Sequence, residues 1–154
     1  MSAPAMEEKI LRDYRALATR LGRIDLPDRH KWSAREEGLR WFAGSVPESV
    51  RHGVSILAEL ATPNEDDPRQ LHIEARIFWS RSAGEDPDPN HMRAILWVTR
   101  GRRTGLQAKS LLGEAPALFM AATSVDGLAT QLLLKIDAAL AAFRREEAAA
   151  DRRD

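Results

Sequence analysis

The densest group of anion-binding side chains is the run Arg100-Gly101-Arg102-Arg103. A guanidinium matches a phosphate with two parallel hydrogen bonds, and glycine lets the backbone approach a ligand closely. Arg100, Arg102 and Arg103 could therefore hold the phosphate of a nucleic acid or a nucleotide. The acidic segment 65–67 should lie at the same end of the predicted sheet, where opposite charges would neutralise one another at little energetic gain. We therefore disfavour nucleic acid as the partner.

Few residues have the pattern that catalysis or metal binding requires. The four histidines are His30, His52, His72 and His91, and none lies three or four residues from another, as paired zinc ligands on a helix do. The chain has no cysteine, which excludes thiolate catalysis and cysteine metal sites. We predict no catalytic residue, no metal site and no cofactor. A small enzyme that uses His30, His72 or Glu74 in a pocket between helices and sheet is our third hypothesis.

Two alternating runs, residues 71–80 and 92–99, flank an acidic, proline-containing segment at 83–90. Side chains of a strand alternate between its two faces, so one face of this predicted β-hairpin is purely apolar and should form the core under the helices. The other face mixes charged residues with large apolar ones. Its candidate partner-binding residues are Arg76, Phe78, Arg93, Ile95 and Trp97.

The aromatic residues of this mixed face should be covered by something. Burying Trp97 or Phe78 is worth a few kcal/mol, whereas an exposed cation–π contact from Arg76 or Arg93 is worth about 0.5–1 kcal/mol. Burial should therefore dominate. We favour an N-terminal helix as the cover, and the alternatives are another protein, a second copy of the chain, or stacked nucleobases.

Helices must position this hairpin. Apolar residues at helical spacing predict a helix over residues 7–21, ended by Gly22. Capping boxes at Ser33 and Ser45 predict two more helices. The second of them should run to about Leu60, although residues 54–60 also fit a strand.

The second half of the chain should complete the sheet and close with a helix. A third strand is expected over residues 106–112, and 117–123 fit either a fourth strand or the start of a helix. A long final helix should begin at Ser124 or Asp126 and extend to about Glu147, with residues 148–154 frayed.

The final helix is apolar over more of its circumference than the ~100° that a surface helix needs. Leu133 and Leu134 extend its apolar surface beyond the main stripe, which consists of Leu128, Leu132, Ile136, Leu140 and Phe143. Either the helix is sunk between the sheet and the first helix, or Leu133 and Leu134 contact a partner.

The order of helices, then strands, then a helix predicts one α+β domain over residues 1–154. It should have N-terminal helices, a three- to four-stranded antiparallel meander sheet, and a long C-terminal helix packed on that sheet. The 23 basic and 23 acidic residues balance, so no net field attracts nucleic acid or a membrane. Neither a signal peptide nor an apolar span of ~20 residues is evident, and we expect a soluble, cytoplasmic protein.

Our first functional hypothesis is a non-catalytic protein-interaction module: an adaptor, accessory subunit, immunity-type inhibitor or assembly component. Its partner would be another protein or a second copy, bound through the mixed sheet face and the final helix. A nucleic-acid or nucleotide binder that uses the arginine run is the second.

Overall fold

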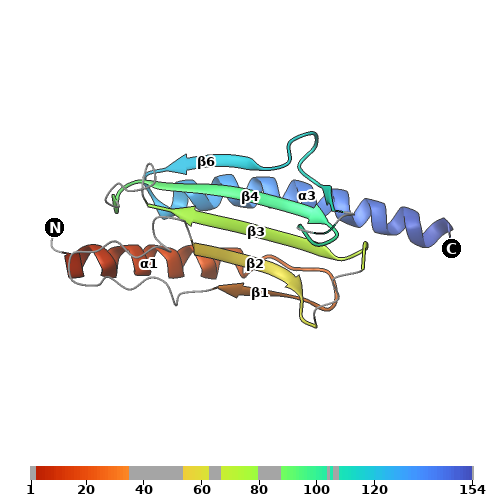
Figure 1. Cartoon of the computed structure of the whole chain (residues 1–154), viewed down its shortest axis with the longest axis horizontal. Helices are drawn as coiled ribbons and strands as arrows, with labels where there is room; N and C mark the ends of the chain where they lie inside the picture. Colours follow the sequence, from red (N-terminus) through yellow and green to blue (C-terminus); the bar gives the residue numbers. More distant parts are fainter. Residues whose placement is uncertain are drawn as a thin grey trace.

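The computed structural model describes residues 3–34, 54–62, 67–79, 88–103, 105 and 108–153. Two helices and six strands follow one another along these parts of the chain (Figure 1). They are α1 (Ala3–Leu21), β1 (His30–Ala34), β2 (Val54–Leu60), β3 (Leu71–Phe78), β4 (Met92–Arg100), β5 (Lys109–Ser110), β6 (Leu118–Ala122) and α3 (Val125–Arg153).

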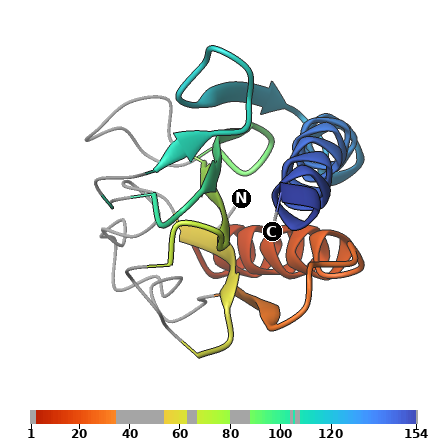
Figure 2. The same cartoon turned by 90° about the vertical axis from the view of Figure 1, so that its right-hand side faces the viewer.

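All six strands belong to one antiparallel sheet in the order β1-β2-β3-β4-β5, with β6 also paired to β4. Strands β5 and β6 share one side of β4, because β3 occupies the other. β6 pairs with residues 92–96, and β5 pairs with residues 99–100. β6 and β1 therefore lie at opposite margins of the sheet (Figures 1 and 2).

Both helices lie on one face of the sheet (Figure 2), and the core is between them and the strands. The Tyr14 hydroxyl donates a hydrogen bond of 2.9 Å to the Ser55 carbonyl, and the Tyr14 ring meets Trp79 edge-on at 6.4 Å. The predicted apolar face of the hairpin is confirmed. Its buried residues are Leu71, Ile73, Ala75, Ile77, Met92, Ala94, Leu96 and Val98.

Where the structure describes the segments predicted as helices from the capping boxes, these segments are strands. Ser33 lies in β1, opposite Leu57 of β2, so the sheet includes a segment for which the sequence suggested a helix start. The strand alternative is right for residues 54–60, which form β2. Val54, Ile56, Ala58 and Leu60 recur at the two-residue period of a strand, although Val54 and Leu57 also fit a helical stripe. Pairing with β3 makes the segment a strand. Residues 35–53 lie outside the described residues.

The strand predicted over residues 106–112 is short: within the described residues only Lys109 and Ser110 form it. Residues 117–123 contain a strand, β6, and not the start of a helix. The α+β class, the antiparallel sheet and the long C-terminal helix are confirmed, with more strands than expected.

The final helix begins where it was predicted to begin. The Ser124 hydroxyl accepts a hydrogen bond of 3.0 Å from the Gly127 amide, so Ser124 is the N-cap. The helix continues to Arg153, beyond Glu147, and fraying of its end in solution stays a prediction. No helix within the described ranges is long and apolar enough to cross a membrane.

Candidate functional site

The face of the sheet opposite the helices, called the outer face below, carries the predicted hairpin residues in three rows, and two of these rows reach β6. Strand register places Phe78 beside Arg93, and Arg93 beside Ala121 of β6. The second row runs from Arg76 through Ile95 to Phe119. The tertiary structure thus adds two residues of β6, Phe119 and Ala121, that the sequence analysis did not single out.

Phe119 is the most exposed large apolar residue described, with 78% of its surface open to solvent. It borders a hollow of about 400 Å³, lined also by Phe78, Arg93, Ile95 and Ala121 together with Ala94 and Met120. We call these five residues, Phe78, Arg93, Ile95, Phe119 and Ala121, the Phe119 surface. Sequence reasoning missed Phe119 because residues 117–123 fit both a helix and a strand. Only the strand assignment puts Phe119 and Ala121 on the same side.

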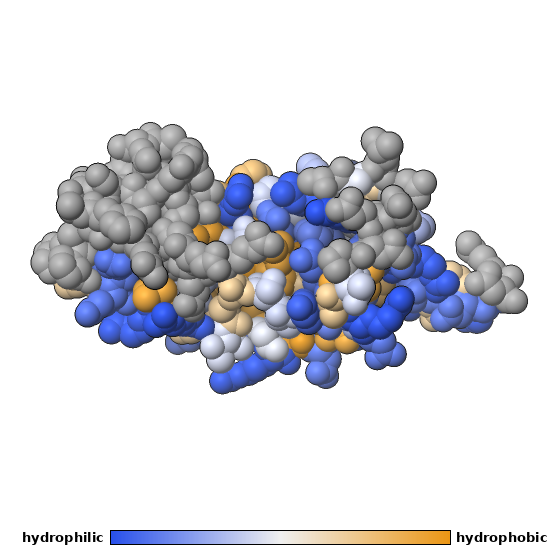
Figure 3. Space-filling view, turned by 60° about the horizontal axis from the view of Figure 1, so that its bottom comes forward, coloured by the Kyte–Doolittle hydropathy of each residue, from blue (hydrophilic) through white to orange (hydrophobic). Residues whose placement is uncertain are grey.

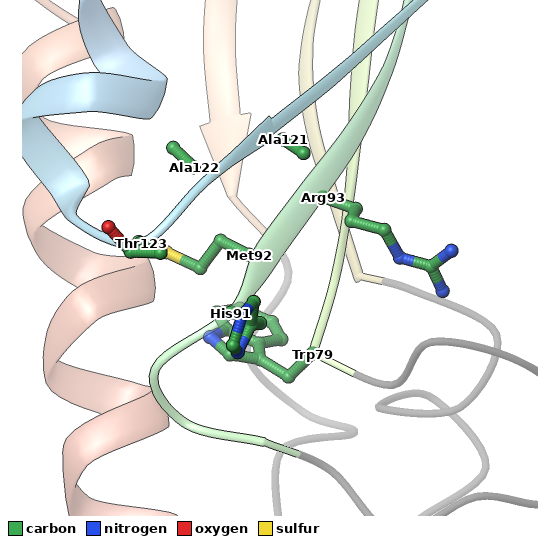
Figure 4. Close-up of a pocket in the computed structure, with 7 residues that line it drawn as sticks. All are labelled: Trp79, His91, Met92, Arg93, Ala121, Ala122 and Thr123. Atoms are coloured by element: carbon green, nitrogen blue, oxygen red, sulfur yellow. The ribbon is translucent and has the colours of Figure 1, made fainter.

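A second hollow of about 480 Å³ adjoins this surface. It shares Arg93 and Ala121 and extends toward Trp79, His91 and Met92, with Ala122 and Thr123 completing its lining. Figure 4 shows the Arg93 side chain extending outward from β4, whereas Met92 points the other way, toward Thr123. The small Ala121 side chain therefore lies at the meeting point of two hollows.

The two margins of the sheet differ in charge. β6 has the sequence Leu-Phe-Met-Ala-Ala and carries no charge, whereas β1 carries Lys31 and begins at His30. Exposed edge strands are usually protected by charged residues, because unpaired backbone groups invite pairing with another chain. The described polar contact at the margin of β6 is a hydrogen bond of 3.0 Å from the Gln131 amide to the Ala121 carbonyl. The edge strand β6 thus lacks the usual protection.

The margin that carries β1 is different in character. Figure 3 brings this side forward and shows hydrophilic residues around a central group of hydrophobic ones. A hollow of about 420 Å³ lies there between α1 and the sheet, lined by Arg15, Trp32 and Ile56 with Ala18, Thr19, Ser33 and Ala34. The Trp32 indole donates to the Ile24 carbonyl at 3.3 Å, so its ring is tied to its own chain.

On the other half of the outer face, the aromatic side chain is in contact with an arginine of the same chain. The Arg103 guanidinium lies 4.4 Å from the centre of the Trp97 ring, and Arg103 Nη2 is 3.3 Å from Glu74 Oε2. The cation–π contact therefore comes from Arg103, and not from Arg76 or Arg93 as considered from the sequence. Of the predicted partner-binding residues, Trp97 is accordingly already in contact with a side chain of its own chain.

His72 lies buried beside this contact. Neither of its ring nitrogens has a hydrogen-bond partner within the described residues, and Nδ1 is 3.8 Å from Glu59 Oε2. Burial lowers the pKa of His72 because it disfavours the imidazolium, and the positive charge of Arg103 acts in the same direction. The carboxylates of Glu59 and Glu74 oppose this shift without reversing it. His72 is therefore neutral at neutral pH.

His30, the other histidine proposed for catalysis, has a structural role. Its Nε2 accepts a hydrogen bond of 2.9 Å from the Leu71 amide, and its Nδ1 lies 3.0 Å from the Asp28 carbonyl, to which it donates. Nε2 thus joins the start of β1 to the start of β3, and Nδ1 fixes the ring against the turn before β1. None of the three residues proposed for catalysis, His30, His72 and Glu74, lines any of the three hollows described above.

Arg100 and Arg103 of the turn do not converge on one site. Arg100 points to the helix side, where Nη1 lies 2.9 Å from Glu146 Oε2, Nη2 contacts Glu147, and the guanidinium lies 5.7 Å from the Phe143 ring centre. Arg103 points to the outer face, onto Trp97. Gly101 between them has φ 84°, a left-handed conformation that glycine adopts without strain.

The acidic segment 65–67 was expected to neutralise the arginine turn, but the described contacts of Asp67 and Arg100 are with other residues. Asp67 accepts a hydrogen bond from the Arg69 amide within its own loop, and Glu65 and Asp66 lie outside the described residues. The acidic partners of Arg100 come instead from α3. Lys109 joins them, with Nζ 2.8 Å from Glu146 Oε1, and the two cations hold the pKa of Glu146 below its usual value.

The two leucines predicted to extend the interface of the last helix separate in the structure. Leu133 is partly buried against the core, and Leu134 is 66% exposed. Within the parts of the chain that are described, no three His, Asp or Glu side chains are grouped so as to hold a metal ion. No family model, curated protein or solved structure matches the chain.

Proposed function

We propose that the protein is a non-catalytic protein-interaction module that binds its partner through the Phe119 surface and the adjoining edge of β6. The observation that carries this proposal is the 78% exposure of Phe119 beside an apolar hollow on an uncharged edge strand. Burying a phenylalanine side chain contributes roughly 1.5–3 kcal/mol, which a partner could use for binding. Energetically dominant interface residues are typically aromatic or arginine side chains near a pocket.

The composition of the surface supports a protein partner. Apolar side chains of Phe78, Ile95 and Phe119 surround one cationic residue, Arg93, which is the mix of aromatic, aliphatic and arginine residues enriched at the centre of protein interfaces. Leu134 lies on α3 and is exposed, but it belongs to the opposite layer of the molecule. We therefore centre the interface on the sheet.

The two alternative functions have less support. A phosphate site at the arginine run would have to displace Glu146 and Glu147 from Arg100, and Glu74 and Trp97 from Arg103. An enzyme would need His30 to leave its two backbone contacts, or His72 to become accessible. For location we keep the cytoplasm as an expectation, supported by the absence of cysteine from the sequence.

Photo-crosslinking tests the interaction surface. A benzoylphenylalanine residue replaces Phe119 in one variant and Arg12, an exposed residue of α1 in the opposite layer, in the control. Irradiation of cells that produce each variant should give a covalent protein adduct at position 119 in clear excess over position 12. Equal yields at the two positions, or no adduct at position 119, would contradict the proposal.

A further inference from the structure

A projecting ring and a cavity lie side by side on β6. Phe119 and Ala121 are separated by one residue, so they point to the same face of the sheet. Phe119 projects into solvent and borders the hollow of about 400 Å³, and Ala121 lines both this hollow and the adjoining one of about 480 Å³. The same strand therefore presents both halves of a possible contact.

A two-fold axis perpendicular to the sheet at Met120 would bring these halves together. In an antiparallel pair about this axis, Phe119 of each copy lies directly opposite Ala121 of the other copy. The outer faces of both sheets stay on the same side. Such an interface is isologous, because the contact from one copy to its partner is repeated in the reverse direction.

We propose that the partner bound at the Phe119 surface is a second copy of this chain, paired along β6 about this axis. The proposal rests on the proposed function and names the occupant of that surface. It joins the two six-stranded sheets into one continuous sheet, with the outer rows meeting at the axis. One row then runs from Phe78 through Arg93 and Ala121 to Phe119 of the partner subunit.

The chemistry of this row is complementary. The ring of the partner's Phe119 would fill the hollow above Ala121 and lie next to the Arg93 guanidinium, which can contact an aromatic ring through a cation–π interaction. Because β6 carries no charge, pairing it with itself brings no like charges together. The Gln131 amide that now contacts the Ala121 carbonyl is exposed, so it can exchange this contact for water.

The register follows from the same residues. A shift by two residues would place Phe119 opposite Phe119 of the partner subunit, or Ala121 opposite its own counterpart. Either shift leaves the cavity at Ala121 without a ring to fill it. A different protein could also supply an apolar side chain for the recess at Ala121, but the Phe119 ring on the same strand would then need a second, separate recess. Pairing centred on Met120 places each Phe119 ring opposite an Ala121 recess.

The mass of the protein in solution, measured by sedimentation over a wide concentration range, tests the proposal. The wild-type chain should sediment as a species of twice 17.2 kDa. Phe119→Ala removes both projecting rings, and the dimer dissociation constant should rise by about 100-fold or more, given the area lost at two equivalent sites. Leu134→Ala, which truncates the other exposed large apolar side chain among the described residues, should leave the dimer unchanged.

An exchange of the two residues tests the register. Ala121→Phe alone sets two rings against each other and should weaken the dimer, whereas the double variant Phe119→Ala/Ala121→Phe restores one ring opposite one alanine and should recover it. Circular dichroism of each variant is the control for folding. A dimer insensitive to Phe119→Ala, or a folded double variant that stays monomeric, would overturn the proposal.

A monomeric wild-type protein would also overturn it. If position 119 then crosslinks to a different polypeptide in cells, the proposed function stands and only the identity of the partner is wrong. If position 119 gives no crosslink, both fail.

Discussion

The guanidinium of Arg103 lies 4.4 Å from the centre of the Trp97 ring, and the same side chain is 3.3 Å from the Glu74 carboxylate. This contact divides the outer face of the sheet. Next to the arginine turn, Trp97 is already in contact with Arg103 of the same chain. Next to β6, Phe119 remains exposed. The proposed interaction surface is therefore the β6 half of the face.

The Arg103 contact should contribute measurably to stability. Arg103→Ala should lower the free energy of unfolding by about 1–3 kcal/mol, because it leaves the largely buried Glu74 carboxylate without this ion pair and Trp97 without its cation. Urea unfolding followed by tryptophan fluorescence gives the value. Arg12→Ala, at an exposed position of α1, should change it by less than about 0.5 kcal/mol.

A double-mutant cycle separates the ion pair from the ring contact. In a Glu74→Gln background, Arg103→Ala should be less destabilising than in the wild type, because no buried carboxylate is left unpaired. The same loss in both backgrounds would assign the whole effect to Trp97.

His72 should make stability depend on pH below neutrality. Its pKa in the folded protein is lowered from the ordinary 6.5 by burial, with Arg103 acting in the same direction and Glu59 and Glu74 opposing. Between these two values the unfolded chain binds more protons than the folded chain. The free energy of unfolding should therefore fall as the pH drops below about 6.5 and be level with respect to this group above it.

The variant His72→Gln should reduce this slope below about pH 6.5. Thermal unfolding at a series of pH values measures it. His91→Gln is the matched control, since His91 is half-exposed and contacts Asp88 at the surface. A slope that persists in His72→Gln would show that other groups cause it.

The contacts between the β4–β5 end of the sheet and α3 should weaken in acid. Hydrogen bonds from Lys109 and Arg100 lower the pKa of Glu146 from its ordinary 4.5. A carboxylate with a lowered pKa stabilises the fold above its unfolded pKa, and this contribution is lost as the pH falls through the folded pKa. Below about pH 4.5, Glu146→Gln should therefore show a shallower loss of stability than the wild type.

The measurement is again unfolding as a function of pH, with Glu114→Gln as the control at an exposed site without a described ion pair. High salt should reduce the difference between wild type and Glu146→Gln, because partly exposed ion pairs are screened. An acid dependence identical in Glu146→Gln and wild type would contradict the prediction.

The sequence predicted the central hairpin because its signal is local. Alternation over residues 71–80 and 92–99 determines which side chains share a face, and the burial of Ile73, Leu96 and their neighbours follows from it. The helical spacing that predicted α1, and the serine cap with the apolar stripe that predicted α3, are also contained within contiguous residues.

The tertiary structure decided what depends on distant partners. Ser33 has the pattern of a helix cap, yet it joins β1 because β2 offers a strand to pair with. Residues 118–122 become a strand because the open side of β4 pairs with them, and only this pairing sets Phe119 and Ala121 beside Ile95 and Arg93.

Arg100 and Arg103 show the same division most clearly. The sequence determined that three arginines share a turn with a glycine, but not where their side chains point. The left-handed conformation of Gly101, the glutamates of α3 on one side of the sheet and Glu74 on the other send the two side chains to opposite faces. Local periodicity is encoded in neighbouring residues, whereas the partner of a charge depends on which segments fold against it.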